Sequence, residues 1–309
     1  MTFNSVILFL NRRCSVGCPS CSAGASSSNN EELNPSWLHS FYQKLNEIHF
    51  SGYLIWTGGE PFFSPSSLKI GLELAASAGY HSEILTSGTW FKTHPGLLEI
   101  PAFSPRVSLR VSLDAEHQKK IEIDSILELI RKAIDLKLEI NFTLREIPGQ
   151  PFSSHLMIEK IKEVFPEFYR ENSGRSRWIH TIPHIPVNGI GVGSYGKRAN
   201  VKYKKPCSMI FRDLVIGEDG LVYPCCGFFS LPEEVRKSLS VGDPIVDSWE
   251  ALINRQSECF VFRVLKEKGP FGLCRESGID TEVFGEGPFE TSCHFCLLLL
   301  KSKLFIENY

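Results

Sequence analysis

Three cysteines near the amino terminus have the residue type and spacing to hold a metal centre. Cys14, Cys18 and Cys21 lie in the segment LNRRCSVGCPSCSAG, residues 10–24. This segment follows the apolar run Val6–Leu10. Four thiolates would close a tetrahedral zinc site or saturate a four-iron cluster. Three leave one position open. The spacing therefore indicates an iron–sulfur cluster with an open coordination site, a zinc site with a distant fourth ligand, or merely buried cysteines.

A second segment, YLIWTGGEPFF, ends an apolar run in Gly58, Gly59, Glu60 and a proline. Paired glycines let the backbone approach a ligand closely, and the Glu60 carboxylate can pair with an ammonium group. The alternative is a tight turn between a strand and a helix, with a solvated glutamate. Taken alone, the segment is more typical of such a turn.

Two further pairs of cysteines lie toward the carboxyl terminus. Gly220, in GEDGLVYP, fits a tight turn between two short strands, which would bring Cys207 and Cys225 together. The segment SCHFC adds Cys293 and Cys296. Four thiolates in two pairs suit a closed metal site, and the spacing by itself favours structural zinc.

Composition limits the class of protein. The chain has 309 residues, of which 42% are hydrophobic and 22% charged, which is typical of a globular protein of about two domains. A net charge of −2 gives no electrostatic footprint for nucleic acid or an anionic membrane. No apolar stretch is long enough to span a bilayer, and no secretory signal is apparent. Ten cysteines are too sparse for a disulfide scaffold, so we expect a cytoplasmic protein whose cysteine clusters bind metal or act in catalysis.

The cysteines must be positioned by elements that alternate along the first 185 residues. The sequence predicts strands at residues 6–10, 53–56, 83–85, 107–113, 138–144 and 178–182, and helices at 35–48, 66–78, 121–136 and 154–164. This alternation predicts βα units around a mostly parallel sheet, either open or closed into an incomplete barrel. Chemistry in such folds lies at the carboxyl ends of the strands, which is where the first cysteines and the GGEP segment fall.

The pattern changes after residue 185. A Gly-rich basic segment at 185–206 is followed by short strands predicted at 214–216 and 221–223, a helix near 248–255, and seven of the ten cysteines. We therefore predict a core domain at 1–185 and a smaller, irregular domain at 186–309.

The combination of CxxxCxxC after the first strand and GGEP after the second resembles the radical S-adenosylmethionine (SAM) superfamily. The resemblance implies a partial (β/α)6 barrel and an enzyme that cleaves SAM reductively to a 5′-deoxyadenosyl radical. It also implies that Cys14, Cys18 and Cys21 ligate a [4Fe–4S] cluster whose fourth iron binds SAM. By the same resemblance, the methionyl ammonium of SAM is held by Gly58, Gly59 and Glu60.

Three later segments also resemble this superfamily. The turn TSG, which contains Ser87, lies where the family often has TNG, and VSLDAEHQ makes Ser112 a plausible SAM contact. Arg145, which ends the fifth predicted strand, could pair with the SAM carboxylate or lie on the surface. One departure is Ser20, where family members commonly carry an aromatic residue.

The later cysteines resemble the SPASM/twitch extension of radical SAM enzymes, whose pattern is cysteine, twelve residues here, glycine, four residues and cysteine. This resemblance implies one auxiliary [4Fe–4S] cluster in the shorter twitch form, and so two clusters in the chain. Cys259 or Cys274 could replace one of the four ligands, which would be Cys207, Cys225, Cys293 and Cys296.

Cys226 adjoins one of these proposed ligands. By resemblance to radical SAM epimerases, its thiol could return a hydrogen atom to a substrate radical. The alternative is an inert buried cysteine. We predict hydrogen abstraction from a peptide or a small natural product, with epimerisation slightly favoured over dehydrogenation or cross-linking through the auxiliary cluster. A non-catalytic, zinc-stabilised binding protein is the alternative from another class. The expected partners are the substrate and a low-potential electron donor such as flavodoxin or ferredoxin, with neither nucleic acid nor membrane.

Overall fold

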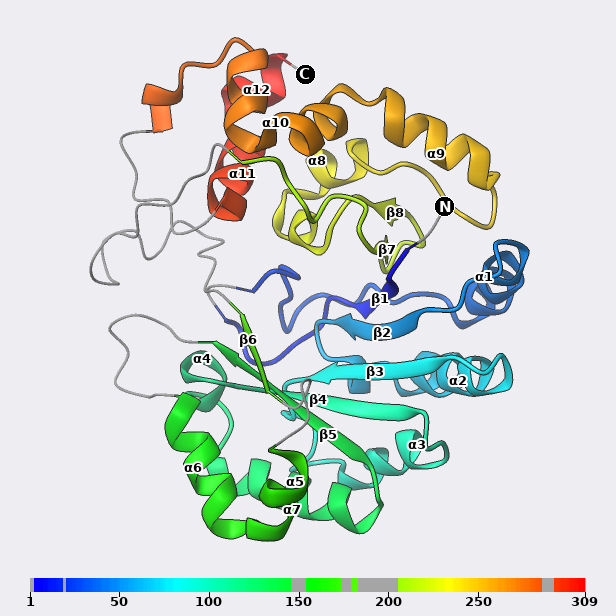
Figure 1. Cartoon of the computed structure of the whole chain (residues 1–309), viewed down its shortest axis with the longest axis vertical. Helices are drawn as coiled ribbons and strands as arrows, with labels where there is room; N and C mark the ends of the chain where they lie inside the picture. Colours follow the sequence, from blue (N-terminus) through cyan, green and yellow to red (C-terminus); the bar gives the residue numbers. More distant parts are fainter. Residues whose placement is uncertain are drawn as a thin grey trace.

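One eight-stranded sheet runs through the computed structural model, which describes residues 3–18, 21–145, 154–173, 179–182, 205–284 and 292–308 (Figure 1). The strand order is β6-β5-β4-β3-β2-β1-β7-β8. Neighbours from β6 to β7 are parallel, and β7 and β8 are antiparallel. The strands are β1 (Ser5–Asn11), β2 (Tyr53–Gly58), β3 (His81–Thr86), β4 (Val107–Asp114), β5 (Glu139–Arg145), β6 (Ile179–Ile182), β7 (Leu214–Ile216) and β8 (Val222–Tyr223).

Helices connect the strands and cover one face of the sheet (Figure 1). Helix α1 shows why they form where they do: the Asn34 side chain accepts a hydrogen bond from the Ser36 N–H, and Pro35 occupies the first turn. The α-helices are α1 (Pro35–Glu47), α2 (Pro65–Ser77), α3 (Glu99–Ala102), α4 (Ala115–Gln118), α5 (Ile123–Asp135), α6 (Ser154–Val164), α7 (Pro166–Asn172), α8 (Glu233–Ser238), α9 (Trp249–Glu258), α10 (Phe260–Glu276), α11 (Ser292–Lys301) and α12 (Lys303–Asn308). The 3-10 helices are η1 (Pro61–Phe63), η2 (Pro95–Leu98), η3 (Cys226–Ser230) and η4 (Thr281–Phe284).

The two faces of the sheet differ in polarity. Along β4, residues 107, 109, 111 and 113 are buried, whereas residues 108, 110 and 112 between them are only partly buried. The polar face carries a network in which Arg110 pairs with the Glu83 carboxylate, and the Asn141 side-chain amide donates to the same carboxylate at 3.2 Å. The apolar face therefore forms the core with the helices, and the polar face is available for a site.

The sheet does not stop where the predicted core domain ends. Strand β7 pairs in parallel with β1, and the register places Val6 opposite Leu214 and Leu8 opposite Ile216. In Figure 1, β7 and β8 lie beside β1, with α8 to α12 above them. The predicted boundary at residue 185 stays a prediction, and the two predicted parts share one sheet.

The predicted α/β fold class is confirmed. Strands β1 to β6 and helices α1, α2, α5 and α6 begin and end within two residues of their predicted bounds. The sequence did not predict the short helices α3 and α4, nor α7, α8 or α10 to α12. The sequence did not predict helix α10 because Gly269 and Pro270 interrupt it. Gly269 has φ of 70° and separates two helical stretches.

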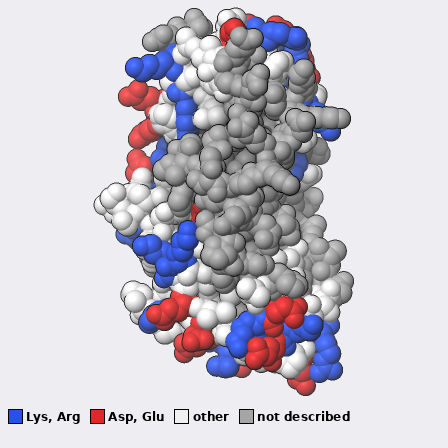
Figure 2. Space-filling view, turned by 90° about the vertical axis from the view of Figure 1, so that its left-hand side faces the viewer, with Lys and Arg blue, Asp and Glu red and all other residues white. Residues whose placement is uncertain are grey.

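Charged side chains of both signs mix on the surface. Figure 2 shows blue and red residues side by side at the lower end of the molecule, where α6 and α7 lie in Figure 1. Ion pairs there join Lys160 to Glu163, Lys162 to Glu159 and Arg170 to Glu167. Among the helices of the described residues, none has both the length and the apolar character to cross a membrane.

Candidate active site

The first three cysteines lie on one closed loop that follows β1, here called the cysteine loop (residues 12–26). Its two ends pair, because the Cys14 N–H donates to the Ser26 carbonyl at 3.1 Å and the Ser26 N–H donates to the Arg12 carbonyl at 3.0 Å. Within the loop, the Cys21 N–H donates to the Cys18 carbonyl at 3.1 Å. The loop therefore brings the three predicted cluster ligands together at the carboxyl end of the sheet.

Burial and neighbouring charges raise the pKa values of two thiols of the cysteine loop, those of Cys14 and Cys18. Burial raises the pKa of the Cys14 thiol to about 12, and the charges of Glu60 and Cys21 add to this rise. Burial also raises the pKa of Cys18, with further contributions from Cys21, Glu116, Asp114 and Cys14. Buried neighbouring thiolates need a positive partner, which a metal centre supplies.

The chemistry of this donor set suits a [4Fe–4S] cluster held by three thiolates. A cluster also spreads its ligands over several irons. Within the described parts of the chain, no three side chains of histidine, cysteine, aspartate or glutamate are arranged to hold a single metal ion.

The two glycines of the GGEP segment pack against the base of the cysteine loop. A Cβ at Gly58, whose φ is 130°, would lie 2.2 Å from the Asn11 carbonyl oxygen. A Cβ at Gly59 would lie 2.2 Å from the Arg13 carbonyl oxygen. The Gly59 N–H donates to Asn11 and the Glu60 N–H donates to Arg13, both at 2.8 Å. The chain's own backbone thus closely approaches both glycines and fixes the entry to the cysteine loop, and their predicted contact with SAM stays a prediction.

Glu60 is fully buried, and its carboxylate joins the turns after β2 and β3. It accepts hydrogen bonds from Thr86 Oγ1 at 2.8 Å, from Ser87 Oγ at 2.5 Å and from the Ser87 N–H at 2.9 Å. The Phe62 N–H adds a longer bond at 3.4 Å. Burial raises the Glu60 pKa despite these donors. The structure therefore brings Glu60 and Ser87 together, and their predicted contact with SAM stays a prediction.

Ser112 and Arg145 lie at the carboxyl ends of the neighbouring strands β4 and β5. Ser112 is partly buried on the polar face and is opposite Thr143 in the register. Arg145 is opposite Asp114 on one side and Ile182 on the other. The side chain of Arg145 lies outside the described residues. Both positions border the same edge as the cysteine loop, and their predicted roles toward SAM stay predictions.

A histidine that the sequence did not single out contacts the cysteine loop. His117 Nε2 lies 3.9 Å from Cys18 Sγ, and His117 Nδ1 lies 2.8 Å from the Asp114 carboxylate. Asp114 ends β4 and caps α4, accepting from the backbone N–H groups of Glu116 and His117. The available signal was an aspartate three residues before a histidine at the end of a strand, which is an N-cap pattern that aims the histidine back at its cap.

The four later cysteines also come together. Cys225 precedes η3, Cys207 is tied by its N–H to the Leu265 carbonyl at 2.9 Å, and the other two lie one turn apart on α11. Burial is the main cause that raises the pKa of the Cys225 thiol. The charges of the neighbouring cysteines raise it further, in the order Cys226, Cys296, Cys207 and Cys293. The fold therefore makes neighbours of the predicted auxiliary ligands.

The two cysteines considered as substitutes are placed differently. Cys274 is fully buried, its Sγ lies 3.4 Å from the Ile279 carbonyl oxygen, and the charge that acts on it is that of Asp280. Cys259 precedes α10 and packs at the edge of the main core.

Cys226 lies between the two cysteine sets. Together with Cys21 it packs against an aromatic cluster that contains Phe9, Tyr223 and Phe229. Its charge also acts on Cys225 and Cys293. Burial raises the Cys226 pKa, and the nearby Asp213 carboxylate adds to the rise. The predicted role of Cys226 as a hydrogen-atom donor stays a prediction.

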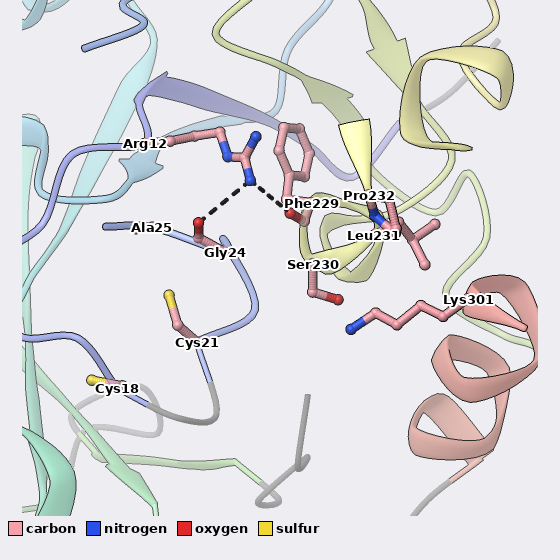
Figure 3. Close-up of a pocket in the computed structure, with 10 residues that line it drawn as sticks. All are labelled: Arg12, Cys18, Cys21, Gly24, Ala25, Phe229, Ser230, Leu231, Pro232 and Lys301. Carbon is pink, nitrogen blue, oxygen red and sulfur yellow. Dashed lines mark hydrogen bonds between the residues drawn. The ribbon is translucent and has the colours of Figure 1, made fainter. Parts of the chain in front are cut away.

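A pocket of about 430 Å³ opens between the cysteine loop and the C-terminal part of the chain (Figure 3). Cys18 and Cys21 line one side, and residues 229–232 with Lys301 line the other. Figure 3 shows the Lys301 side chain extending into the pocket toward Ser230. Burial lowers the Lys301 pKa.

Arg12 holds the two sides of this pocket together. Its guanidinium donates to the carbonyls of Ala23 at 3.2 Å and Gly24 at 3.4 Å, and across the gap to that of Phe229 at 3.3 Å (Figure 3). It also lies 3.8 Å from the buried Glu218 carboxylate. Since a guanidinium is a rigid planar fork, these contacts fix the distance between the cysteine loop and η3.

The chain is similar in sequence to one known protein and in fold to several solved structures. No protein-family model matches the chain. The chain is 19% identical over 279 residues to the "Putative peptide biosynthesis protein YydG" of Bacillus subtilis (strain 168), covering 86% of this chain and 81% of that protein.

Solved structures share its fold. A histidine-tagged anSMEcpe with bound AdoMet (SAM) has a TM-score of 0.58 and 14% identity, covering 98% of this chain and 92% of that one. Native anSMEcpe with bound AdoMet and Kp18Cys peptide has a TM-score of 0.55 and 14% identity, covering 98% and 96%. The shared fold confirms the predicted α/β fold class, and these similarities agree with the resemblance to the radical SAM superfamily and its SPASM/twitch-type extension.

Proposed function

We propose that this chain, a radical SAM enzyme, modifies a peptide by moving a hydrogen atom at a carbon centre, with epimerisation as the favoured outcome. The observation that carries the proposal is the position of Cys226, which packs against the same aromatic cluster as Cys21 and whose charge acts on Cys225 and Cys293 of the second cysteine set. A relative described as a peptide biosynthesis protein and a fold neighbour with bound peptide support a peptide substrate.

The residues of the cysteine loop would hold a [4Fe–4S] cluster through Cys14, Cys18 and Cys21. Cys207, Cys225, Cys293 and Cys296 would hold the auxiliary cluster. When bound, the first cluster and SAM would supply the abstraction of a hydrogen atom from a substrate carbon, with 5′-deoxyadenosine as the by-product. A soluble low-potential donor such as flavodoxin or ferredoxin, met in the cytoplasm, would supply the electron for this cleavage.

The chain itself positions these groups. The turn at Gly58 and Gly59 anchors the base of the cysteine loop, and buried Glu60 locks that turn to the one after β3. At the same sheet edge, Ser112 and Arg145 are the candidates for contact with SAM. Arg12 sets the distance between the cysteine loop and η3. Precise spacing matters because misplacement of reacting groups by about 1 Å can cost on the order of 100-fold in rate.

Cys226 then decides the product. In epimerisation its S–H bond breaks, and the hydrogen atom forms a new C–H bond on the opposite face of the substrate radical. The sulfur is left as a thiyl radical, and one electron and one proton, from the low-potential donor and solvent, restore the thiol. Burial supports this role because it keeps the hydrogen on sulfur. Loss of an electron from the substrate radical to the auxiliary cluster would instead give dehydrogenation, or cross-linking if a neighbouring group attacks.

The test is expression of the chain together with candidate peptides encoded beside its gene. Products would be analysed by mass spectrometry and by chiral analysis of the hydrolysed amino acids. In D₂O, epimerisation through Cys226 should place one deuterium at the inverted carbon. Cys226→Ala should still form 5′-deoxyadenosine but lose both the inversion and the deuterium.

Cys274→Ala is the matched control. Cys274 is also a buried thiol, but its S–H donates a hydrogen bond to the Ile279 carbonyl. It should keep inversion and deuterium incorporation. A mass loss of two hydrogens that persists in Cys226→Ala would replace epimerisation by dehydrogenation or cross-linking. Zinc without acid-labile sulfide in an anaerobic preparation would overturn the enzyme proposal and favour a zinc-stabilised binding protein.

A further inference from the structure

The pocket between the cysteine loop and η3 has a basic lining. Its charged residues, among the described residues that line it, are Arg12 and Lys301, and these lining residues include no aspartate or glutamate. Apolar side chains, those of Ala25, Phe229 and Leu231, form much of the remainder (Figure 3). A ligand that fits this lining combines an apolar part with a negative charge.

The charge of Arg12 is already used within the fold. Its guanidinium donates to three backbone carbonyls and lies 3.8 Å from the Glu218 carboxylate. Glu218 also pairs with the buried Arg236 at 3.0 Å, and Arg236 lies 3.6 Å from Asp219. The two positive and two negative charges of this network cancel. Lys301 therefore supplies the net charge of the described lining.

Lys301 enters the pocket from the helix that carries two of the later cysteines. It is the last residue of α11, and its side chain extends into the pocket toward Ser230 of η3 (Figure 3). Cys18 and Cys21 line the same pocket. The ammonium group of Lys301 thus shares one pocket with two of the predicted cluster ligands.

A carboxylate is the group that this ammonium position favours. Burial lowers the pKa of Lys301, because the charged form is less well solvated there. A carboxylate brought by a ligand would favour the charged form again. Since an ammonium group has three N–H donors, it can bind a carboxylate and still keep a contact within the chain. The Ser230 hydroxyl does not offer its hydrogen in the same way, because it donates to the Gly227 carbonyl at 2.9 Å.

We propose that Lys301 is a specificity-determining residue that binds a carboxylate of the peptide substrate, either that of an acidic side chain or the C-terminal one. These are the negative groups that an unmodified peptide carries. The apolar part of the lining would contact the side chain beside the bound carboxylate. The proposal rests on the proposed function, because it takes the substrate to be a peptide.

The experiment compares Lys301→Met with the wild type in the anaerobically reconstituted chain. Methionine keeps an apolar stem and removes the charge. The probe is the peptide that the wild-type chain modifies on co-expression, labelled at its amino terminus with a fluorophore. Loss of a hydrogen bond between charged groups should weaken peptide binding about 30-fold in anisotropy titrations. The KM for the peptide should rise to the same extent, whereas kcat and the KM for SAM should not change.

Lys303→Met is the matched control, because it removes the same charge two residues further along the chain. Lys303 is exposed and is not among the described residues that line the pocket. It should leave the affinity for the peptide unchanged. A wild-type affinity in Lys301→Met would overturn the proposal, as would an equal loss in Lys303→Met or a rise in the KM for SAM in place of that for the peptide.

Changes in the peptide distinguish the two sources of the carboxylate. If a side chain is bound, Lys301→Glu should lose peptide binding, and replacement of one acidic residue of the peptide by lysine should restore it. If the C-terminal carboxylate is bound, a C-terminal amide should bind to the wild type as weakly as the unaltered peptide binds to Lys301→Met. Failure of both changes would overturn the proposal. If the wild-type chain modifies no peptide, the proposed function fails instead, so the two failures are distinguishable.

Discussion

Replacement of Gly59 by alanine tests whether the GGEP turn anchors the cysteine loop. The new Cβ would lie 2.2 Å from the Arg13 carbonyl oxygen and 2.5 Å from its carbonyl carbon. Since carbon atoms pack at roughly 3.5 Å, the two backbone segments must separate by about 1 Å. Gly59 does not have a positive φ, so the cost arises from this collision.

The magnitude follows from the bonds that the separation breaks. The Gly59–Asn11 and Glu60–Arg13 backbone hydrogen bonds, both 2.8 Å, contribute about 1 kcal/mol each. Alanine returns about 0.5 kcal/mol by restricting the unfolded chain. We therefore expect Gly59→Ala to lower the free energy of unfolding by about 1.5 kcal/mol. The rate of 5′-deoxyadenosine formation should fall on the order of 100-fold, because Cys14 follows Arg13 directly.

The assays are urea unfolding of the metal-free chain and anaerobic turnover of SAM with dithionite. Gly96→Ala is the control, because no atom lies within 4 Å of a Cβ added there. It should change neither quantity. The proposed anchoring role of the turn would be refuted by two results together: a free energy of unfolding of Gly59→Ala within about 0.5 kcal/mol of the wild-type value, and SAM cleavage at the wild-type rate.

Three further outcomes are expected. Arg12→Lys should lower the free energy of unfolding by about 2 kcal/mol in urea titrations, since an ammonium cannot keep all three carbonyl bonds, whereas the same change at exposed Arg170 should have no effect. At pH 8 the raised pKa should make alkylation of Cys14 about 1,000-fold slower in the folded metal-free chain than in urea, measured by mass spectrometry. The alkylation rate should rise about tenfold per pH unit, because the thiolate fraction does; a folded-chain rate equal to that in urea would contradict the burial. Cys296→Ala should reduce the iron content from about eight to about four per chain, whereas Cys274→Ala should keep it, and equal losses would mean that Cys274 is a ligand.

The sequence predicted the elements that have a clear period and clear ends. Strands β1 to β6 alternate with helices that begin at recognisable caps, such as Asn34 before Pro35, and their bounds were close to those observed. Helix α10 was missed because the Gly269–Pro270 interruption is indistinguishable in sequence from a helix end. The helical setting of Cys293 and Cys296 was missed because a CxxC pair fits a loop as well as one turn of a helix.

The site was predicted in its residue types and less well in its contacts. The three early cysteines lie close enough to act on one another, and so do the four later ones, whereas their predicted roles as cluster ligands stay predictions. The sequence did not predict that Gly58 and Gly59 pack against the backbone of Asn11 and Arg13, and the predicted contact of these glycines with SAM stays a prediction. The contact of His117 with Cys18 joins the turn after β4 to the loop after β1, 99 residues away in the chain, and no local pattern predicts such a long-range contact.

The pairing of β1 with β7 has a consequence for synthesis of the chain. About 200 residues separate these neighbours, so a ribosome working at roughly 5–20 residues per second needs about 10–40 s to deliver the second after the first. During that interval the nascent chain presents an unpaired strand edge, a template for contact with other chains. We therefore expect the nascent chain to depend on chaperones until the three-residue strand at 214–216 has been synthesised. We expect metal to be loaded only after that strand has paired with β1.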